Sequence, residues 1–593
     1  MKNQRNMILA IVLTGLLLFG WDSAGRHFYP QAAKPAASQQ AQPASTGTSA
    51  AGTTAKPTRE GGLANPADVA LEAQDLKTAL ASPARVPIAA PGLSGSINLA
   101  GAVLDDLTVN RHTASVEKNS GPARIFSPAG TPAQQFAQFG WVGAKDAGVE
   151  LPNASTVWTA PPGAKLTPET PVTLSWSNPT GQTFAITFAI DKDYMVTATE
   201  TVVNRGAGPI SVQPFALLNR TNKTMSADSW NIHSGPFGAF DGKVSFGPDY
   251  KDVTSAGQVA GEGKTNWIGF TDIYWMSTLI PDAAPTTSSF RALGNSVFRA
   301  DLIYQPQIVG PGQQLARTTR LFAGAKESTV LDRYEAAGVP NFGLAIDWGW
   351  FRWFEKPIFW LLTALFHFAG NFGVAIILLT VIVRGIMFPV AQRQFASMAQ
   401  MRAIQPKMKA LQERYKDDKQ KLQEETMKLY KTEGVNPLAG CLPLFLQIPV
   451  FFALYKVLMV SIEMRHQPFV LWIKDLSAPD PLHILNLFGL LPFTPPSFLG
   501  IGILALLLGV TMWLQFKLNP AAADPMQQQV FAIMPWMMMF IMAPFAAGLL
   551  IYWITSNLLT IAQQKYLYSR HPQLRAQADK DAANAKRAAA KAK

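Results

Sequence analysis

The sequence predicts a multi-pass α-helical membrane protein of about six spans that carries one large all-β sandwich domain. Three observations lead there: long apolar runs recur, basic residues concentrate beside them, and a long stretch of short alternating strands separates the first run from the others. A helix crosses the roughly 30 Å of bilayer hydrocarbon with about 20 residues, and each run is near or adequate to that length. The runs cover residues 7–21, 372–391, 438–461, 498–516, 529–545 and 546–562.

The distribution of charge predicts the orientation. Residues 392–436 hold ten Lys or Arg against six acids, and residues 565–593 hold eight against two. Lys2 and Arg5 precede the first run. Because basic loops stay in the cytoplasm, these segments and both termini are expected there. Residues 22–349 are close to neutral, so this large portion is expected to be translocated.

The N-terminal segment resembles a secretory signal, with a basic start and a short apolar region. No convincing Ala-x-Ala cleavage site follows it, so residues 1–21 are predicted to form an uncleaved signal-anchor span, with a cleaved signal as the open alternative. Residues 22–60 are rich in Ala, Pro and Ser and predict a flexible linker.

Residues 61–340 are assigned to the β-sandwich domain. Stretches such as VTLSWSN and QTFAITFAI alternate apolar and polar residues, as half-buried strands do. The domain shows no metal-ligand spacing, G-x-S-x-G motif or phosphate loop, so no metal, cofactor or catalytic residue is predicted. Asp191, Asp193 and Glu200 could indicate glycoside chemistry, but on alternating strands such residues usually belong to the solvated face.

An aromatic segment over residues 345–370 is predicted to be an amphipathic helix lying along the membrane surface, because Trp and Tyr favour that layer. The alternative is an N-terminal extension of the next span, which Pro357 and Gly370 disfavour.

Arg384 is the only charge in the apolar run of span 2, assigned to residues 371–391. Its α-carbon lies about 10 Å inside the nearer membrane face, at 1.5 Å per helical residue. A charge there costs at least about 2.5–3.5 kcal/mol, so Arg384 is expected in a wet cavity or in a functional role. The alternative is that its long stem reaches the headgroups.

Residues 392–436 predict a cytoplasmic hairpin of two charged helices, with Asp417 and Asp418 marking the turn as helix N-caps. Such a hairpin can dock partners or pack against itself. Spans 3 to 6 are assigned to residues 437–570, where Lys456 is expected to extend to the membrane surface. Residues 571–593 form a basic cytoplasmic tail.

Several segments closely resemble the YidC family of bacterial membrane protein insertases, part of the wider YidC/Oxa/Alb family. The resemblance covers about residues 345–570, with segment order preserved. It is carried by RGIMFPVAQRQFASMAQMR, QPKMKALQERYKDDKQKLQEETMKLYKTEGVNPLAGCLPLFLQIPVFFALY, LWIKDLSAPDPLHIL, DPMQQQVFAIMPWMMMF and GLLIYWITSNLLTIAQQ. It implies the Gram-negative form: a periplasmic β-supersandwich followed by a five-helix insertase core in the inner membrane.

The resemblance also implies a hydrophilic groove within the membrane that receives polar parts of an incoming segment. Arg384 would attract acidic residues there. Family members often carry paired tyrosines where this chain has Tyr552 and Trp553, which weakens a hydrogen-bonding role for Trp553. For every groove residue other than Arg384, the alternative is an ordinary interhelical hydrogen bond. The predicted groove residues are Arg384, Thr380, Gln447, Thr511, Gln515, Tyr552, Trp553 and Ser556.

The expected function is insertion and folding of nascent inner-membrane proteins, alone or with the Sec translocon, without enzyme chemistry. The implied partners are the nascent client, the Sec translocon, the lipid bilayer, the signal recognition particle pathway, and the ribosome through the basic tail and the hairpin. Two alternatives stay open. One is a solute or anion transporter centred on Arg384, and the other is a membrane-anchored carbohydrate-binding enzyme that uses the β domain.

Overall fold

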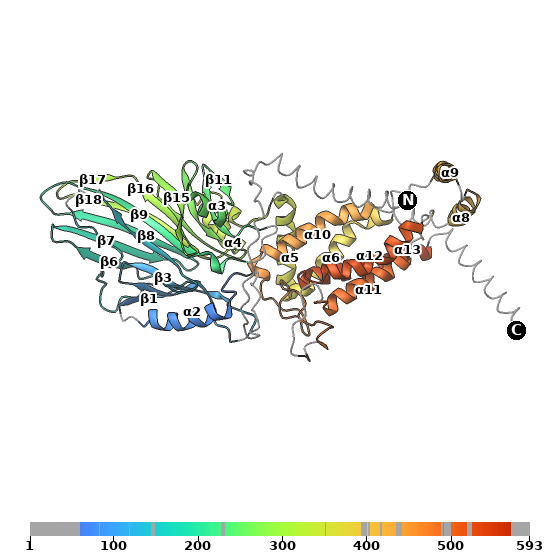
Figure 1. The fold of residues 1–593 in the computed structure, drawn as a ribbon, viewed down its shortest axis with the longest axis horizontal. Coiled ribbons are helices and arrows are strands. Elements are labelled where there is room, and N and C mark those ends of the chain that lie inside the picture. Colours follow the sequence, from blue (N-terminus) through green and yellow to red (C-terminus); the bar gives the residue numbers. More distant parts are fainter. Residues whose placement is uncertain are drawn as a thin grey trace, which may run out of the picture. The chain divides into compact units, whose positions relative to one another are not determined.

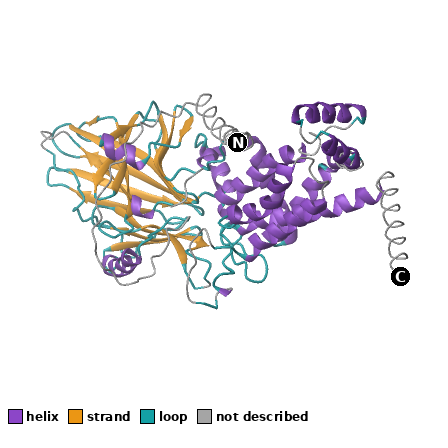
Figure 2. Cartoon of the chain, turned by 45° about the vertical axis from the view of Figure 1, so that its right-hand side comes forward, coloured by secondary structure: helices purple, strands orange, loops and turns teal. Residues whose placement is uncertain are grey.

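The fold is known from a computed structural model. It describes residues 60–81, 84–117, 119–143, 149–226, 232–349, 351–392, 400, 404–415, 418–434, 442–487, 490–491, 500–518 and 525–570. The predictions for the signal anchor, for the linker up to residue 59 and for the basic tail lie outside the described residues. The strands and the long helices belong to separate regions of the chain (Figures 1 and 2).

The β region consists of two antiparallel sheets. One sheet has the order β1-β2-β3-β5-β9-β16-β15-β12, with β4 paired to β3 and β17 to β9. The other has the order β11-β10-β13-β14-β18-β8-β7-β6. The strands are β1 Arg85–Ala89, β2 Leu93–Asn98, β3 Val103–Thr113, β4 Pro122–Phe126, β5 Gln135–Val142, β6 Val172–Ser177, β7 Gln182–Ile190, β8 Met195–Asn204, β9 Ile210–Thr221, β10 Gly235–Phe240, β11 Lys243–Ser245, β12 Gln258–Ala260, β13 Thr265–Thr271, β14 Trp275–Ile280, β15 Thr286–Gly294, β16 Val297–Tyr304, β17 Gln307–Val309 and β18 Gln314–Ala325.

Aromatic side chains join the two sheets. Burial alternates strictly along β7, as its alternating sequence requires. Phe139 of β5 packs against Phe188 of β7 with ring centroids 5.8 Å apart, and Trp141 packs against Phe184 at 5.1 Å. β5 belongs to the first sheet and β7 to the second. The prediction of a single all-β sandwich is therefore confirmed.

The solvated-face interpretation of the β-domain carboxylates is wrong for two of them. Glu200 is fully buried, because it shares the inward phase of β8 with Ala198 and Val202. Asp193 is also buried, in the turn before β8, and forms ion pairs with Arg111 and Arg333. A glycosidase role for these residues gains no support, since the strand phase and the arginines account for their burial.

Short helices precede, interrupt and follow the strands of the β region. The sequence patterns did not predict the first of them, which is largely exposed: Glu72 is its only buried residue. Two residues at its start favour this helix. The Asn65 side chain accepts a hydrogen bond from the Ala67 N–H, and Pro66 occupies the first turn. The helices of this region are α2 Pro66–Ala79, η1 Asn222–Thr224, α3 Tyr250–Ala256, α4 Ser328–Ala336 and η2 Phe342–Ala345.

The helical region begins with the aromatic segment. Its helices are α5 Arg352–Ala369, α6 Phe372–Ile386, α8 Gln405–Arg414, α9 Lys419–Thr432, α10 Leu442–Val460, η4 Ile462–Met464, α11 Ile503–Leu518, α12 Pro525–Met542 and α13 Ala547–Arg570. Across the part of the chain that the structure describes, no helix combines the length and hydropathy needed to cross a membrane. The number of spans stays a prediction.

α5 and α6 are separate helices, as predicted. Gly370 ends α5 with φ 69°, a left-handed conformation that glycine adopts readily. Asn371 then caps α6 by accepting a hydrogen bond from the Val374 N–H at 3.1 Å. Pro357 does not contribute to the break, because it lies inside the first half of α5. Trp353 and Trp360 of α5 are exposed, as expected for a helix that meets a membrane surface.

The described part of the expected hairpin contains two helices, α8 and α9, and its cytoplasmic placement stays a prediction. α8 and α9 contact each other, and the Asp418 side chain accepts a hydrogen bond from the Lys421 N–H at 3.0 Å. Asp417 lies outside the described residues. The prediction for Lys456 is wrong: its side chain is buried, and its Nζ lies 3.8 Å from Asp347 Oδ2. Asp347, near the end of the β region, therefore lies against the Lys456 ammonium, which was expected to extend to the membrane surface.

Candidate functional site

α13 organises the polar side chains of the helical region. It contacts α6, α10 and α11. Four of its polar residues are buried and spaced four residues apart, so they form one slowly drifting stripe along the helix. They are Tyr552, Ser556, Thr560 and Gln564. Buried polar groups require partners, so this stripe marks where polar contacts concentrate in an otherwise apolar region.

Arg384 reaches this stripe from the last turn of α6. Its Nε donates to Ser556 Oγ at 3.1 Å, and its Nη2 donates to the same oxygen. Ser556 is buried, whereas Arg384 is half-buried. None of α6, α10, α11, α12 and α13 contains an Asp or Glu, and among the described residues Arg384 forms no ion pair. A guanidinium with five N–H donors thus has one hydroxyl as its acceptor within the described residues.

A second polar contact lies on the same stripe. Gln447 of α10 donates through Nε2 to the hydroxyl of Tyr552, which is 1% exposed. Trp553, the next residue, instead packs against Phe451 with ring centroids 5.1 Å apart. The structure therefore brings together Arg384 with Ser556, and Gln447 with Tyr552, and gives Trp553 a packing contact.

The remaining predicted residues lie apart from these contacts. Thr380 is buried and donates to the Ile376 carbonyl of its own helix at 2.6 Å. Thr511 of α11 donates to the Leu508 carbonyl at 3.0 Å and accepts from Asn557 Nδ2 at 3.2 Å. Gln515 is half-buried one turn further along α11. Thr511 thus matches the alternative of an ordinary interhelical hydrogen bond.

The sequence patterns missed three buried polar residues of α13: Asn557, Thr560 and Gln564. Asn557 joins α13 to α11, and Thr560 donates to the Ser556 carbonyl at 2.7 Å. A signal was present, because Thr560 and Gln564 continue the four-residue spacing that begins with Tyr552 and Ser556.

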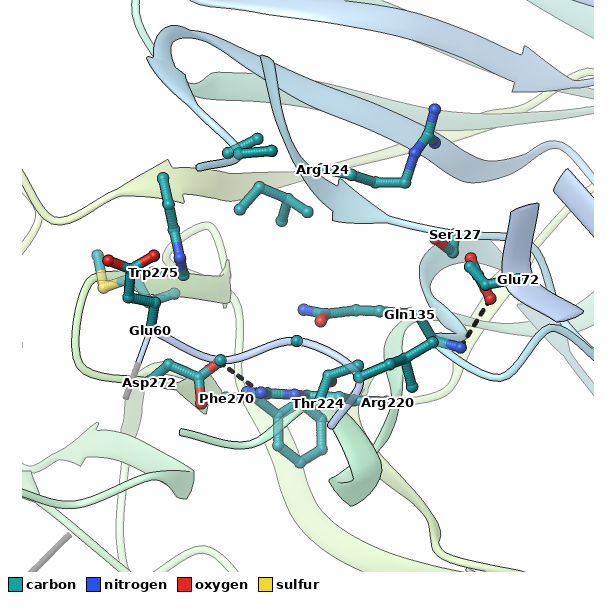
Figure 3. Close-up of a pocket in the computed structure, with 18 of the residues that line it drawn as sticks. Glu60, Glu72, Arg124, Ser127, Gln135, Arg220, Thr224, Phe270, Asp272 and Trp275 are labelled. Atoms are coloured by element: carbon teal, nitrogen blue, oxygen red, sulfur yellow. Dashed lines mark hydrogen bonds and ion pairs between the residues drawn. The ribbon is translucent and has the colours of Figure 1, made fainter. Parts of the chain in front are cut away.

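A cavity of about 480 Å³ lies in the β region, and each of its carboxylates, Glu60, Glu72 and Asp272, accepts at least one hydrogen bond (Figure 3). Asp272 is paired with Arg220 and also accepts from the Ser226 N–H at 3.1 Å. Glu72 accepts from the Ala133 N–H at 2.9 Å. Since a glycoside hydrolase needs a pair of carboxylates available to the substrate, this cavity gives the carbohydrate-enzyme alternative no support.

Two family models match the chain, one for each region. The model of the YidC periplasmic domain covers residues 85–361, and the model of the 60Kd inner membrane protein covers residues 364–574. The boundary between them falls within α5, close to where the strands give way to the long helices.

Close relatives extend over almost the whole chain. The membrane protein insertase YidC of Zymomonas mobilis is 44% identical over 573 residues, and that of Rhizobium etli is 43% identical over 587 residues; each match covers 96% of this chain and 96% of the relative. A crystal structure of an active YidC insertase matches 82% of this chain and 93% of its own, at 18% identity and a TM-score of 0.37. The chain therefore belongs to the YidC family of membrane protein insertases, inner-membrane proteins with a periplasmic β domain.

Proposed function

We propose that this protein moves segments of nascent inner-membrane proteins from water into the lipid bilayer, and that Arg384 receives acidic groups of the passing segment. The predicted groove would be lined by Arg384, Gln447, Tyr552 and Ser556. This work needs no covalent step, because lowering the barrier to a polar backbone and to carboxylates suffices.

The observation that carries the proposal is the charge balance around Arg384. Its described hydrogen bonds go to one hydroxyl, and the five helices α6 and α10 to α13 contain no carboxylate. A guanidinium stays charged at any physiological pH. An arginine kept without an internal counter-ion attracts an external one, and a carboxylate accepts two N–H groups of a guanidinium at once.

The stripe of buried polar residues on α13 also supports the proposed groove. Tyr552 and Ser556 already accept hydrogen bonds from Gln447 and Arg384. Each hydroxyl keeps further hydrogen-bonding capacity, since a hydroxyl has one donor and two acceptor positions. The stripe can therefore exchange internal hydrogen bonds for bonds to a client backbone, each worth under about 2 kcal/mol.

We also propose that the hairpin and both termini lie in the cytoplasm. The proposed partners are the ribosome, the Sec translocon and the signal recognition particle pathway. The tail over residues 571–593 is strongly basic and suits contact with ribosomal RNA through counterion release. Deleting it should weaken co-sedimentation with ribosomes, most clearly at low salt. Unchanged sedimentation at low salt would remove the ribosome from the tail's role. The Sec translocon and the signal recognition particle pathway are proposed as the sources of clients.

The test of Arg384 uses the purified full-length protein in liposomes with one single-span client in two versions. The acidic version carries Asp or Glu in its translocated flank, and the neutral version carries Asn or Gln at the same positions. Protease protection scores insertion. Arg384→Ala should lower insertion of the acidic version by about tenfold, the effect of 1.4 kcal/mol, and of the neutral version much less. Arg384→Lys should retain much of the activity because the charge remains.

Thr380→Val is the matched control, since Thr380 lies one turn away on α6 and its hydroxyl bonds within its own helix. It should insert both versions like the wild type. Equal insertion of the acidic and neutral versions by Arg384→Ala, at the wild-type level, would reject the electrostatic role of Arg384.

A further inference from the structure

Three potential metal ligands meet far from Arg384, where the start of the described chain reaches the loop after α10. They are Glu60, which lies before α2, and His466 and Asp475, which follow η4. One ligand atom from each lies within 4.8 Å of the other two. His466 Nε2 is 2.9 Å from Glu60 Oε1 and 4.0 Å from Asp475 Oδ2.

These separations suit a small divalent cation. Zinc binds imidazole nitrogen and carboxylate oxygen at about 2.0–2.2 Å, so two ligand atoms of one zinc ion lie about 3–4 Å apart. The two separations from His466 Nε2 lie at the edges of that range, and all three ligand atoms lie within 4.8 Å of one another. One imidazole and two carboxylates are also a set of donors that zinc accepts.

Each of the three side chains is oriented by a contact at its other polar atom. His466 Nδ1 lies 3.3 Å from Thr113 Oγ1 of β3, and Arg465 Nη2 donates to Glu60 Oε2 at 2.8 Å. Asp475 Oδ1 accepts from the N–H of Ser477 at 2.8 Å and from its hydroxyl at 2.7 Å. Contacts of this kind fix the orientation of the ligands in metal sites, and they leave the facing atoms available to an ion.

Asp475 offers one of its two oxygens to a ligand. Its side chain is 7% exposed, yet within the described residues its Oδ2 accepts no hydrogen bond and has only His466 Nε2 at 4.0 Å. Oδ1 is held by the N–H and hydroxyl of Ser477, so Oδ2 is the Asp475 oxygen that faces the other two ligands. The Arg465 guanidinium does not pair with Oδ2, because its described partners are Glu60 and two backbone carbonyls, those of Thr113 and Ala114.

A second histidine–glutamate pair shows what the third ligand adds. His112 Nε2 lies 3.0 Å from Glu327 Oε1, but no third ligand joins this pair among the described residues. The same Glu327 oxygen also accepts from the hydroxyl of Tyr194. His112 is therefore a matched control, since it has the same pairing without the open carboxylate.

We propose that Glu60 Oε1, His466 Nε2 and Asp475 Oδ2 bind one divalent transition-metal ion, zinc by its choice of ligands, with water as the fourth ligand. With a neutral imidazole, the two carboxylates and Arg465 carry a net charge of −1, which favours a divalent cation. The ion would tie Glu60 to a loop some 400 residues later in the chain. Since metal binding that requires the folded arrangement adds to folding stability, zinc would hold the β region to the helical region.

The test measures zinc on the tag-free full-length protein in detergent, after removal of metal with a chelator. The protein is dialysed against zinc chloride, bound zinc is counted by plasma mass spectrometry, and the thermal midpoint is recorded with and without zinc. Wild type should bind about one zinc per chain more than His466→Gln and Asp475→Asn, because each variant removes one of three ligands. Its midpoint should rise with zinc, and the midpoints of the two variants should not.

Asp475→Asn keeps the shape of the side chain and an acceptor for Ser477, so it separates loss of metal from loss of fold. His112→Gln should bind as much zinc as the wild type. Equal zinc content in the wild type, His466→Gln and Asp475→Asn would overturn the proposal and leave an ion-pair network only. A loss of zinc in His112→Gln as large as that in His466→Gln would overturn it as well.

Discussion

The β region and the helical region bury positive charge in different ways. In the β region, Arg220 is 2% exposed and pairs with Asp272. In the helical region, Arg384 meets the hydroxyl of Ser556, and neither its own helix α6 nor any of α10 to α13 contains a carboxylate. A paired buried charge contributes to the fold, because removing one partner leaves the other charge buried without a counter-ion. Arg384 has no counter-ion among the described residues, and we propose that its charge is available to a client.

The β region also contains a buried acid, Glu200, that forms no ion pair among the described residues. Glu200 and Arg384 differ in whether they can lose their charge. Glu200 is fully buried, and burial raises the pKa of its carboxyl well above the usual range. A carboxylic acid escapes the cost of burial by keeping its proton. Arg384 has no such escape, because a guanidinium does not lose its proton in proteins. The charge of Arg384 is therefore permanent, whereas burial favours the neutral form of Glu200 by raising its pKa.

The largest expected effect comes from breaking the pair in the β region. Arg220→Ala leaves Asp272 buried without its cation and should lower the free energy of unfolding by about 3–5 kcal/mol. Urea unfolding of the purified protein, followed by tryptophan fluorescence, measures this. Arg291→Ala is the control, because Asp301 keeps a second partner in Arg299, and it should cost about 1 kcal/mol or less. Equal losses in both variants would contradict the difference between the two pairs.

A smaller effect should follow from Glu200 and appear as a dependence on pH. Its folded-state pKa is raised, so the wild-type protein should lose stability as pH rises above about 4.5, until the folded-state pKa is passed. The slope contributed by this residue is up to about 1.4 kcal/mol per pH unit. Glu200→Gln should remove that contribution. Parallel pH profiles of the free energy of unfolding for the two proteins would show that Glu200 is not held neutral.

The smallest effect is expected at the α11–α13 contact. Asn557→Ala removes the hydrogen bond to Thr511 and should cost about 0.6 kcal/mol, a typical value for a hydrogen bond between membrane helices. Client insertion should change little, since Asn557 contacts neither Arg384 nor Ser556 among the described hydrogen bonds. The thermal midpoint and the insertion assay together test this. Loss of insertion at unchanged stability would place Asn557 among the client contacts.

Sequence patterns predicted the features that depend on local physics. Strand alternation predicted the sandwich, and Gly370 with the break after it predicted two helices where the aromatic segment meets span 2. The stripe on α13 was predicted in part, from Tyr552 and Ser556. Thr560 and Gln564 were not predicted as part of the stripe, although they continue the same four-residue spacing.

Features that depend on distant pairing could not be predicted. Lys456 was expected at the membrane surface, yet its partner is Asp347, which precedes it by more than 100 residues. Glu60 lies about 400 residues before His466 and Asp475, so the three form no ligand spacing in the sequence. The phase of β8 alone would have placed Glu200 inside, but its charge argued for the surface.

The most direct test of the account gives Arg384 the internal partner that Arg220 already has. Ser556→Asp places a carboxylate where Arg384 now meets a hydroxyl. The variant should accumulate normally, because the added acid neutralises the half-buried charge of Arg384. It should lose the wild-type preference for the client with an acidic flank over the neutral one, scored by protease protection in liposomes. An unchanged preference for the acidic client in Ser556→Asp would contradict the claim that the unpaired charge of Arg384 receives the client.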